Sequence, residues 1–247
     1  MKKNYFDIHS HVTFKDYDQD VSEVVARMED EGVYTIAVGV NKKTSEDEVA
    51  FAQGKENFFA SIGLHPTDTA TETFSDTEYR ALAADPKVVA VGECGIDYFR
   101  LEGDIVSEKK RQWREFEKQV DFAVKYDKPL MIHCRPSKGT VDAYEEMAAF
   151  LKSKQREAGE KLRGNMHFFV GNADVARKFY DIGFTTSFTG VLTFTHDYDE
   201  VVRIAPLDMI MTETDAPFAA PAPFRGRRNE PSYVKYVVEA IARVRRE

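Results

Sequence analysis

The chain has 247 residues, of which 43% are hydrophobic and 31% charged, and its formal net charge is −8. This composition is typical of a globular protein with a full core, and no apolar run approaches the roughly 20 residues of a membrane span. An acidic chain argues against a protein that binds nucleic acid through a broadly basic surface. No secretory signal peptide is visible, and Cys94 and Cys134 are too few for a disulfide scaffold. We therefore expect reduced thiols and a cytoplasmic protein.

Eight short apolar runs follow one another along the chain, and each predicts a buried parallel strand. They are Asn4–His9, Val33–Val40, Phe58–Leu64, Lys87–Gly92, Pro129–His133, Asn165–Val170, Phe184–Thr189 and Asp208–Glu213. Between them, helical periodicity marks Val21–Glu31, Lys109–Lys125, Ala173–Asp181 and Ser232–Val244. Capping-box spacing predicts two further helix starts, at Ser45 with Glu48 and at Ser75 with Glu78. Two glycines are placed to end helices, Gly32 and Gly183.

This alternation of strands and helices predicts an α/β fold, a single (β/α)8 barrel of the TIM type over residues 1–247. A doubly wound open sheet is the alternative, but no glycine-rich dinucleotide-binding motif follows the first run. The proline-rich stretch Ala216–Arg228 predicts a shaped surface loop, because no change of composition marks a domain boundary there.

Residues that bind metals fall at the ends of the predicted strands. Because the carboxyl ends of barrel strands meet around one mouth, residues far apart in sequence converge there. The residues at such positions are His9, His11, His65, Glu93, His133, His167 and Asp215. Of the six histidines, only His196 lies away from a strand end.

Asp7, His9 and His11 alternate along the first strand and therefore face the same way, so two imidazoles can clamp one divalent ion. Asp7 is then either an acceptor behind the histidines or a buried polar residue. Each histidine alone also fits a hydrogen-bonded core residue, and Glu93 alone fits an ion pair with Arg135. Together, however, mixed histidine and carboxylate side chains predict a metal centre.

Six ligands exceed the needs of one tetrahedral catalytic zinc ion, so we predict two divalent ions, of Mg, Mn or Zn. Glu93 is the expected bridge, because a carboxylate has two oxygens. The first ion is assigned to His9, His11, Glu93 and Asp215, and the second to Glu93, His133 and His167.

Several motifs occur together in a fixed order. They are Asp7-Ile8-His9-Ser10-His11, Gly63-Leu64-His65-Pro66, Gly92-Glu93-Cys94-Gly95-Ile96-Asp97-Tyr98, Pro129-Leu130-Met131-Ile132-His133-Cys134-Arg135, Glu213-Thr214-Asp215-Ala216-Pro217-Phe218 and Arg228-Asn229-Glu230-Pro231. Over nearly the whole chain they resemble the TatD-type metal-dependent deoxyribonucleases, a branch of the amidohydrolase-like barrels. The resemblance implies a somewhat distorted barrel, a two-metal site and exonuclease action on single-stranded DNA ends. It implies the same six metal ligands, a substrate contact at His65 and a site arginine at Arg135.

One motif departs from the family pattern. The family usually follows the histidine of the sixth strand with Cys-Phe-Ser/Thr-Gly, whereas here His167 precedes Phe168-Phe169-Val170-Gly171. The ligand is kept, but the small hydroxyl residue is missing, so substrate contacts near this strand are expected to differ.

The expected reaction is attack on phosphorus by a metal-activated hydroxide, with Asp215 as general base and Glu93 as the bridge. His65 would stabilise the phosphate or protonate the leaving oxygen. Arg135 suits a phosphate oxygen, or else an ion pair with a carboxylate behind the site. Asp97 either orients a ligand histidine or caps the next helix.

Two further segments have alternative interpretations. Tyr98, Phe99 and Arg100 either stack on a nucleobase or pack within the protein, and we expect Tyr98 to contact substrate. The basic run Arg225–Arg228 either lines a phosphate track or is a solvated loop. We expect a monomer with no membrane association and no obligate protein partner.

Other functions remain open. Two-metal barrels also cleave amides and other esters, including aminoacyl-tRNA, and fold does not settle function. Many of them bridge their metals through a carboxylated lysine, but Glu93 stands where that lysine would be, which favours the nuclease-like branch. A non-catalytic binding module is disfavoured, because a structural metal site is closed and needs fewer ligands.

Overall fold

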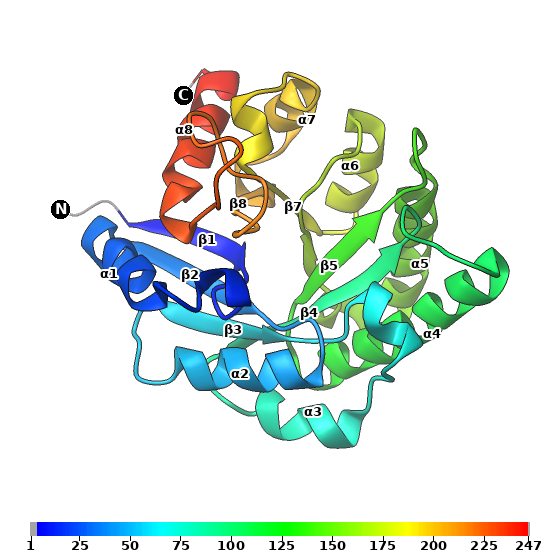
Figure 1. Cartoon of the computed structure of the whole chain (residues 1–247). Helices are drawn as coiled ribbons and strands as arrows, with labels where there is room; N and C mark the ends of the chain where they lie inside the picture. Colours follow the sequence, from blue (N-terminus) through cyan, green and yellow to red (C-terminus); the bar gives the residue numbers. More distant parts are fainter. Residues whose placement is uncertain (1–3, 247) are drawn as a thin grey trace.

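The computed structural model describes residues 4–246. Eight parallel strands form one sheet in sequence order, and helices cover its outer face, which gives a TIM-type barrel (Figure 1). The strands are β1 (Tyr5–Ser10), β2 (Val33–Val38), β3 (Phe58–Ile62), β4 (Val88–Asp97), β5 (Leu130–Arg135), β6 (Gly164–Met166), β7 (Thr185–Phe188) and β8 (Ile210–Thr212). The helices are α1 (Val21–Glu31), α2 (Lys42–Ala52), α3 (Asp76–Ala83), α4 (Ile105–Lys125), α5 (Asp142–Ala158), α6 (Ala173–Tyr180), α7 (Asp199–Ile204) and α8 (Val234–Arg245).

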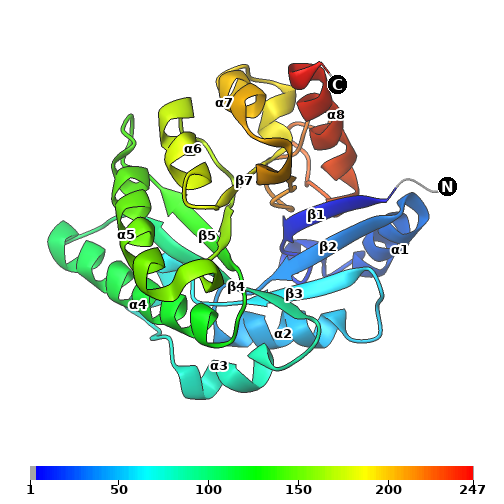
Figure 2. The same ribbon diagram turned by 180° about the vertical axis from the view of Figure 1, so that it is seen from behind.

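The barrel is closed at its mouth and not along the whole of β1 and β8. No β1–β8 ladder forms among the residues described, and an isolated parallel bridge joins Ser10 to Ala216. Two backbone hydrogen bonds tie the same seam, from the Asp215 N–H to His9 O (2.9 Å) and from the His11 N–H to Ala216 O (2.7 Å). Seen from behind, β1 lies beside α8 at this seam (Figure 2). The seam therefore fixes three of the predicted ligands relative to one another.

Two strands differ from their predicted lengths near the site. β4 continues to Asp97, so Glu93 lies within the strand and not at its end. β6 ends at Met166, so the prediction that His167 lies in this strand is wrong. The cause is Phe168, whose φ of 47° takes the chain out of the extended conformation.

One predicted helix start is also wrong. The capping box of α2 is formed by Asn41 and Thr44, whereas Ser45 and Glu48 lie inside the helix and are fully buried. Ser75 does occupy the N-cap position of α3, although its side chain makes no capping hydrogen bond. Gly32 ends α1 with a φ of 71°, as the sequence predicts.

Two clusters of buried apolar side chains support these elements. The larger packs the helices from α2 to α8 against the sheet, and the smaller holds α1 against β2 and β3. Among residues 4–246, no helix is both long enough and apolar enough to cross a lipid bilayer.

Candidate metal centre

Four of the predicted ligands surround one point at the barrel mouth. His9 Nε2 lies 3.2 Å from His11 Nε2, 3.5 Å from Glu93 Oε2 and 3.7 Å from Asp215 Oδ1. His11 Nε2 lies 3.8 Å from the same Glu93 oxygen and 3.6 Å from the same Asp215 oxygen. Zinc bonds of roughly 2.0–2.1 Å require tetrahedral edges of roughly 3.3–3.5 Å between donor atoms. These five distances fit a divalent ion among the four side chains.

The second carboxylate oxygen of Glu93 faces a different set of histidines. Oε1 lies 2.8 Å from His133 Nδ1, 3.1 Å from His167 Nε2 and 3.4 Å from His65 Nε2. His65, which the sequence analysis treats as a substrate contact, thus lies at donor distance from this oxygen. Three sets of donors are each compact enough to hold an ion: two contain Glu93, with His9 and His11 or with His65 and His133, and the third consists of His9, His167 and Asp215. Glu93 therefore presents one oxygen to each donor set, as a bridging carboxylate would.

Irregularities in the strands aim these side chains. The pairing of β1 with β2 shifts between Asp7 and Ser10, around His9, and the pairing of β4 with β5 shifts between Val91 and Cys94, around Glu93. Such bulges commonly turn a side chain toward an active site. Gly95 allows β4 to pass close to β5, because a Cβ there would lie 1.9 Å from His133 O.

The site combines two buried carboxylates with five imidazoles. Burial opposes ionisation of Glu93, yet the surrounding imidazoles of His65, His167 and His133 stabilise its carboxylate and hold its pKa well below the usual range. Burial also lowers the pKa values of His9 and His65. These two imidazoles are therefore neutral near pH 7, and the neutral form is the one in which His9 could bind a metal.

Carboxylates behind the ligands orient two of the histidines. Asp97 Oδ2 lies 3.1 Å from His133 Nε2, and its other oxygen accepts the N–H groups of Phe99 and Arg100. Asp97 thus lies where it can orient His133, but it does not cap the next helix, because the N-cap of α4 is Asp104. Glu213 was not singled out from the sequence, although it ends the last predicted strand. It is fully buried, and its Oε1 lies 3.4 Å from His167 Nδ1.

Asp7 acts on the backbone behind the site. It accepts hydrogen bonds from the His9 N–H (3.2 Å), the Thr214 N–H (2.8 Å) and the Thr214 hydroxyl (2.6 Å). Asp7 therefore joins the His9 segment to the Asp215 segment. Asp215 itself has a φ of 53°, a conformation that aspartate tolerates better than most residues.

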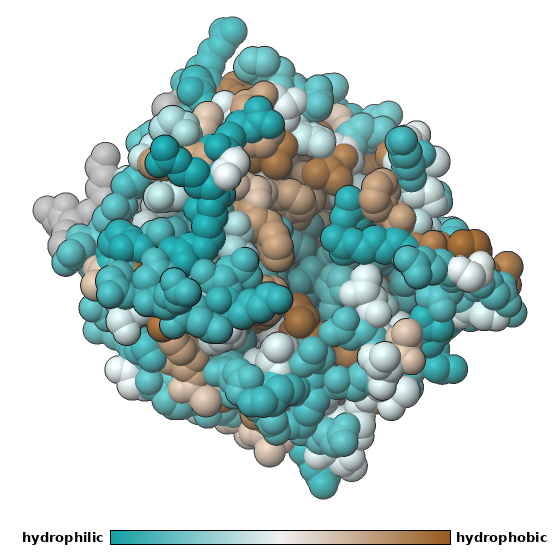
Figure 3. Space-filling model, in the orientation of Figure 1, coloured by the Kyte–Doolittle hydropathy of each residue, from teal (hydrophilic) through white to brown (hydrophobic). Residues whose placement is uncertain are grey.

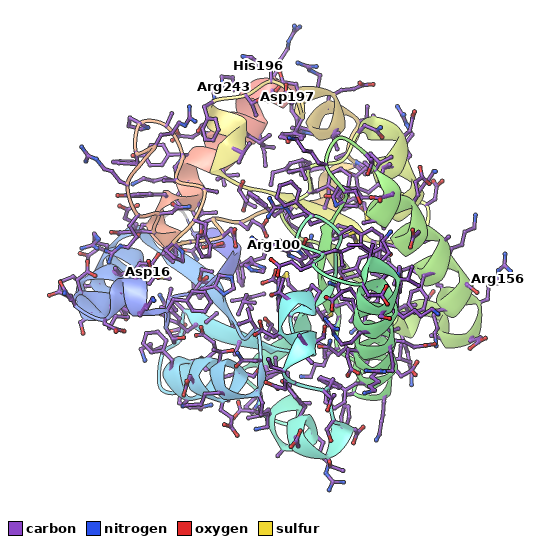
Figure 4. All side chains as sticks on the ribbon, turned by 45° about the vertical axis from the view of Figure 1, so that its right-hand side comes forward. Asp16, Arg100, Arg156, His196, Asp197 and Arg243 are labelled. Atoms are coloured by element: carbon purple, nitrogen blue, oxygen red, sulfur yellow. The ribbon has the colours of Figure 1, made fainter. Side chains whose placement is uncertain are left out.

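The centre opens into a cavity of about 570 Å³. Arg135 and Arg100 line this cavity together with apolar residues of the mouth. Arg135 forms no ion pair with a carboxylate in the described part of the chain, and its guanidinium lies 4.1 Å from the ring centroid of Phe99. Arg100 lies near the centre of Figure 4, whereas His196 lies at the outer edge of the molecule. The alternative ion pair between Arg135 and Glu93 is therefore not formed.

The structure contradicts the expectation that Tyr98 contacts substrate. It does not line the cavity, because its ring is 4% exposed and packs under Lys109. Its hydroxyl donates to Glu146 (2.5 Å) and accepts from the Trp113 indole N–H (2.7 Å). Tyr98 is a packing residue, and Phe99 beside it is the exposed aromatic.

The basic run divides in two. Arg228 binds both carboxylate oxygens of Asp20 at 2.6 Å, so it fixes the loop to the N-terminus of α1 and is not free for phosphate. Arg225 is exposed and lies 3.9 Å from the ring centroid of Phe194. The phosphate-track interpretation therefore does not extend to Arg228.

Comparisons with known proteins agree with this architecture. The family model of the TatD related DNases matches residues 6–247. An uncharacterized metal-dependent hydrolase of Bacillus subtilis, YabD, is 39% identical over 97% of this chain and 91% of its own length. A 3′-5′ ssDNA/RNA exonuclease TatD of Cronobacter sakazakii is 31% identical over 98% of this chain and 90% of its own.

A solved structure shares the fold. The TatD homolog YJJV of Escherichia coli K12 superposes with a TM-score of 0.85 at 27% identity, covering 100% of this chain and 92% of its own. The family match, together with these relatives over nearly the full chain, shows that the chain belongs to the TatD-related DNase family.

Proposed function

We propose that this protein is a metal-dependent hydrolase that removes nucleotides from the 3′ end of single-stranded nucleic acid, with DNA as its main substrate. The observation that carries the proposal is the position of Glu93, whose two oxygens face two separate sets of imidazoles at 2.8–3.8 Å. A bridging carboxylate between two donor sets is the arrangement that enzymes use for in-line displacement at phosphorus.

The donor set fits two divalent ions. His9, His11, Glu93 and Asp215 would hold one, and Glu93, His133 and His167 the other, with His65 near the second. When bound, the ions would supply Lewis-acid stabilisation of the phosphoryl oxygens and activation of water.

The chain's own residues have separate tasks in this proposal. Asp215 accepts the proton of the attacking water. Burial would raise its pKa, but His11 and the other nearby histidines outweigh burial and keep the pKa below the usual range, so the carboxylate is ionised and able to accept a proton. His65 carries its proton on Nε2, since Nδ1 accepts the Thr67 N–H at 3.2 Å. Its Nε2–H group can therefore donate a hydrogen bond to a phosphate oxygen or to the leaving oxygen. Arg135 offers a fork of donors to a phosphate.

Support for nucleic acid as substrate comes from relatives and from local charge. The Cronobacter sakazakii relative is named as a 3′-5′ ssDNA/RNA exonuclease. The net charge of −8 opposes nonspecific binding of a polyanion, but Arg135 places positive charge at the cavity itself, whereas Arg100 there is paired with Asp97 at 3.1 Å. Bound cations would add to it.

The test is digestion of a 5′-labelled single-stranded oligonucleotide with Mg²⁺, Mn²⁺ or Zn²⁺. Wild type and Glu157→Gln, an exposed glutamate on α5, should give the same ladder of shortened products. Glu93→Gln should give none.

Cleavage that persists in Glu93→Gln would show a contaminating nuclease or a different site. Failure with every metal, combined with turnover of aminoacyl-tRNA or of an ester or amide library, would replace the nuclease assignment with another hydrolase activity.

A further inference from the structure

A strained residue stands directly after the ligand His167. Phe168 has a φ of 47°, in the left-handed region that a bulky side chain rarely adopts. Unlike the neighbouring Phe169, which is 2% exposed and packs in the core, Phe168 is only partly buried and lines the cavity. Backbone strain of this kind persists only where the surroundings enforce it, and it collects at functional sites.

Three buried or partly buried groups enforce this turn. The Phe168 N–H donates to Glu213 Oε1 at 2.5 Å, the Phe169 N–H to Ser187 O at 3.0 Å, and the Val170 N–H to the Tyr144 hydroxyl at 3.1 Å. Successive N–H groups are thus fixed by Glu213, which directly follows β8, by β7 and by α5. The ring of Phe168 is therefore fixed on the cavity side, with its centroid 6.1 Å from that of His167 and its plane inclined by 24°.

Two further apolar side chains, Val170 and Phe218, line the same cavity as Phe168, and the three are called the apolar wall here. Val170 is 36% exposed and Phe218 50% exposed, and both line the cavity. Two arginines also line the cavity: Arg135, the last residue of β5, and Arg100, which follows β4 and is paired with Asp97 at 3.1 Å. Figure 3 shows apolar residues lining the central hollow within a largely hydrophilic surface. The cavity thus offers a cation, Arg135, for a phosphate and apolar side chains for a flat apolar group.

We propose that Phe168, supported by Val170 and Phe218, is a stacking subsite for the terminal nucleobase of the bound strand. The inference rests on the proposed nuclease function and adds a determinant of its specificity. The wall lies beside His167, so a base stacked on Phe168 would leave its own sugar and phosphate directed toward the metal centre. Stacking recognises the flat face of any base, so the subsite requires a base but selects no sequence.

The experiment removes each partner of the contact in turn. One oligonucleotide carries a normal 3′-terminal nucleotide, and a matched one carries a 3′-terminal abasic residue. Wild type, Phe168→Ala and Phe168→Gly are compared, the last because glycine accepts the positive φ without strain. Phe6→Ala, which alters a 42% exposed phenylalanine at the opposite end of the barrel, is the control.

Loss of a stacked base corresponds to roughly a 5- to 150-fold loss in kcat/KM. The kcat/KM of wild type should fall by this factor when the 3′-terminal residue is abasic. The kcat/KM of both Phe168 variants should fall by the same factor on the normal oligonucleotide, mainly because KM rises. On the abasic end the variants should equal wild type, because the contact is already absent. Equal losses on both oligonucleotides would overturn the subsite.

A binding measurement separates this proposal from the nuclease proposal. An oligonucleotide with 3′-terminal 2-aminopurine is titrated into the protein without added metal, and quenching of its fluorescence reports stacking. Quenching that requires Phe168 supports the subsite even if no cleavage occurs. Absence of quenching in wild type overturns it, whether or not the protein proves to be a nuclease.

Discussion

Glu213 offers a sharp test of how the protein positions its candidate ligands. Its Oε1 accepts the Phe168 N–H and faces His167 Nδ1, while its Oε2 accepts the Ser187 hydroxyl at 2.9 Å. The Ser187 hydroxyl also lies 2.7 Å from Asn165 Oδ1. Glu213 therefore combines a structural role, holding the strained turn, with an electrostatic role beside His167.

Two substitutions separate these roles. In Glu213→Gln the amide oxygen keeps the Phe168 N–H, and the amide nitrogen can donate to the Ser187 oxygen, whose single hydrogen then goes to Asn165 Oδ1. The fold is kept and only the charge beside His167 is lost. Loss of such a partner behind a ligand histidine typically lowers metal affinity about 10- to 100-fold. Glu213→Ala additionally leaves the Phe168 N–H without an acceptor, at about 1–3 kcal/mol, and opens a cavity, so we expect about 2–4 kcal/mol of lost stability.

The assays are urea unfolding of the metal-free protein and calorimetric titration with Zn²⁺ or Mn²⁺. The free energy of unfolding of Glu213→Gln should lie within about 1 kcal/mol of the wild-type value, but this variant should bind the metal more weakly. Glu213→Ala should lose both stability and metal affinity. Two results would refute the reasoning. One is wild-type metal affinity in Glu213→Gln, and the other is a stability loss in Glu213→Gln as large as that in Glu213→Ala.

Further predictions concern other contacts of the site. Asp97→Asn should weaken metal binding about 10- to 100-fold, measured by the same titration, because His133 loses its charged partner. Chelation of bound metal should lower the melting temperature by roughly 5–10 °C, since saturation at 100 times Kd contributes about 2.7 kcal/mol. This metal-dependent shift should shrink as the pH falls. Burial lowers the pKa values of His133 and His167, but their carboxylate partners outweigh it and raise both, so bound protons compete with the metal at acidic pH. The free energy of unfolding, measured in urea, should be about 1 kcal/mol higher for Phe168→Gly than for Phe168→Ala, because only glycine avoids the strain of the positive φ. Arg228→Ala should lower stability by about 1 kcal/mol without changing the salt dependence of KM for an oligonucleotide, because this arginine binds a carboxylate of the protein.

The sequence predicted the fold and the convergence of the candidate ligands well, because both depend on simple rules. Apolar runs specify buried strands, and a parallel barrel brings the strand ends to one mouth. His9 and Asp215, separated by almost the whole chain, were therefore expected to meet, and their side chains lie 3.7 Å apart.

The features that were missed depend on contacts between distant segments. Nothing local to Phe168 predicts a left-handed conformation, which is imposed by Ser187 of β7 and by Glu213, which directly follows β8. Tyr98 was expected to contact substrate, but α4 and α5 supply Trp113 and Glu146 as partners for its hydroxyl. Such pairings are decided only when the helices pack.

The capping box of α2 shows a different limit, that of competing local signals. Ser45 with Glu48 and Asn41 with Thr44 both have the spacing of a capping box, and the chain uses the second pair. Glu48 is instead buried and accepts the Thr13 hydroxyl at 2.7 Å. Burial against another segment, which the spacing does not encode, decides between the two.

The central claim, that Glu93 joins two ions into one hydrolytic site, is tested most directly by titrating the metal-free protein with Mn²⁺ while following cleavage of a single-stranded oligonucleotide. Full activity should require two equivalents of Mn²⁺ per chain, and Glu93→Gln should remain inactive at any ratio. Full activity at one equivalent, or cleavage by the Glu93→Gln variant, would contradict the bridged two-metal site.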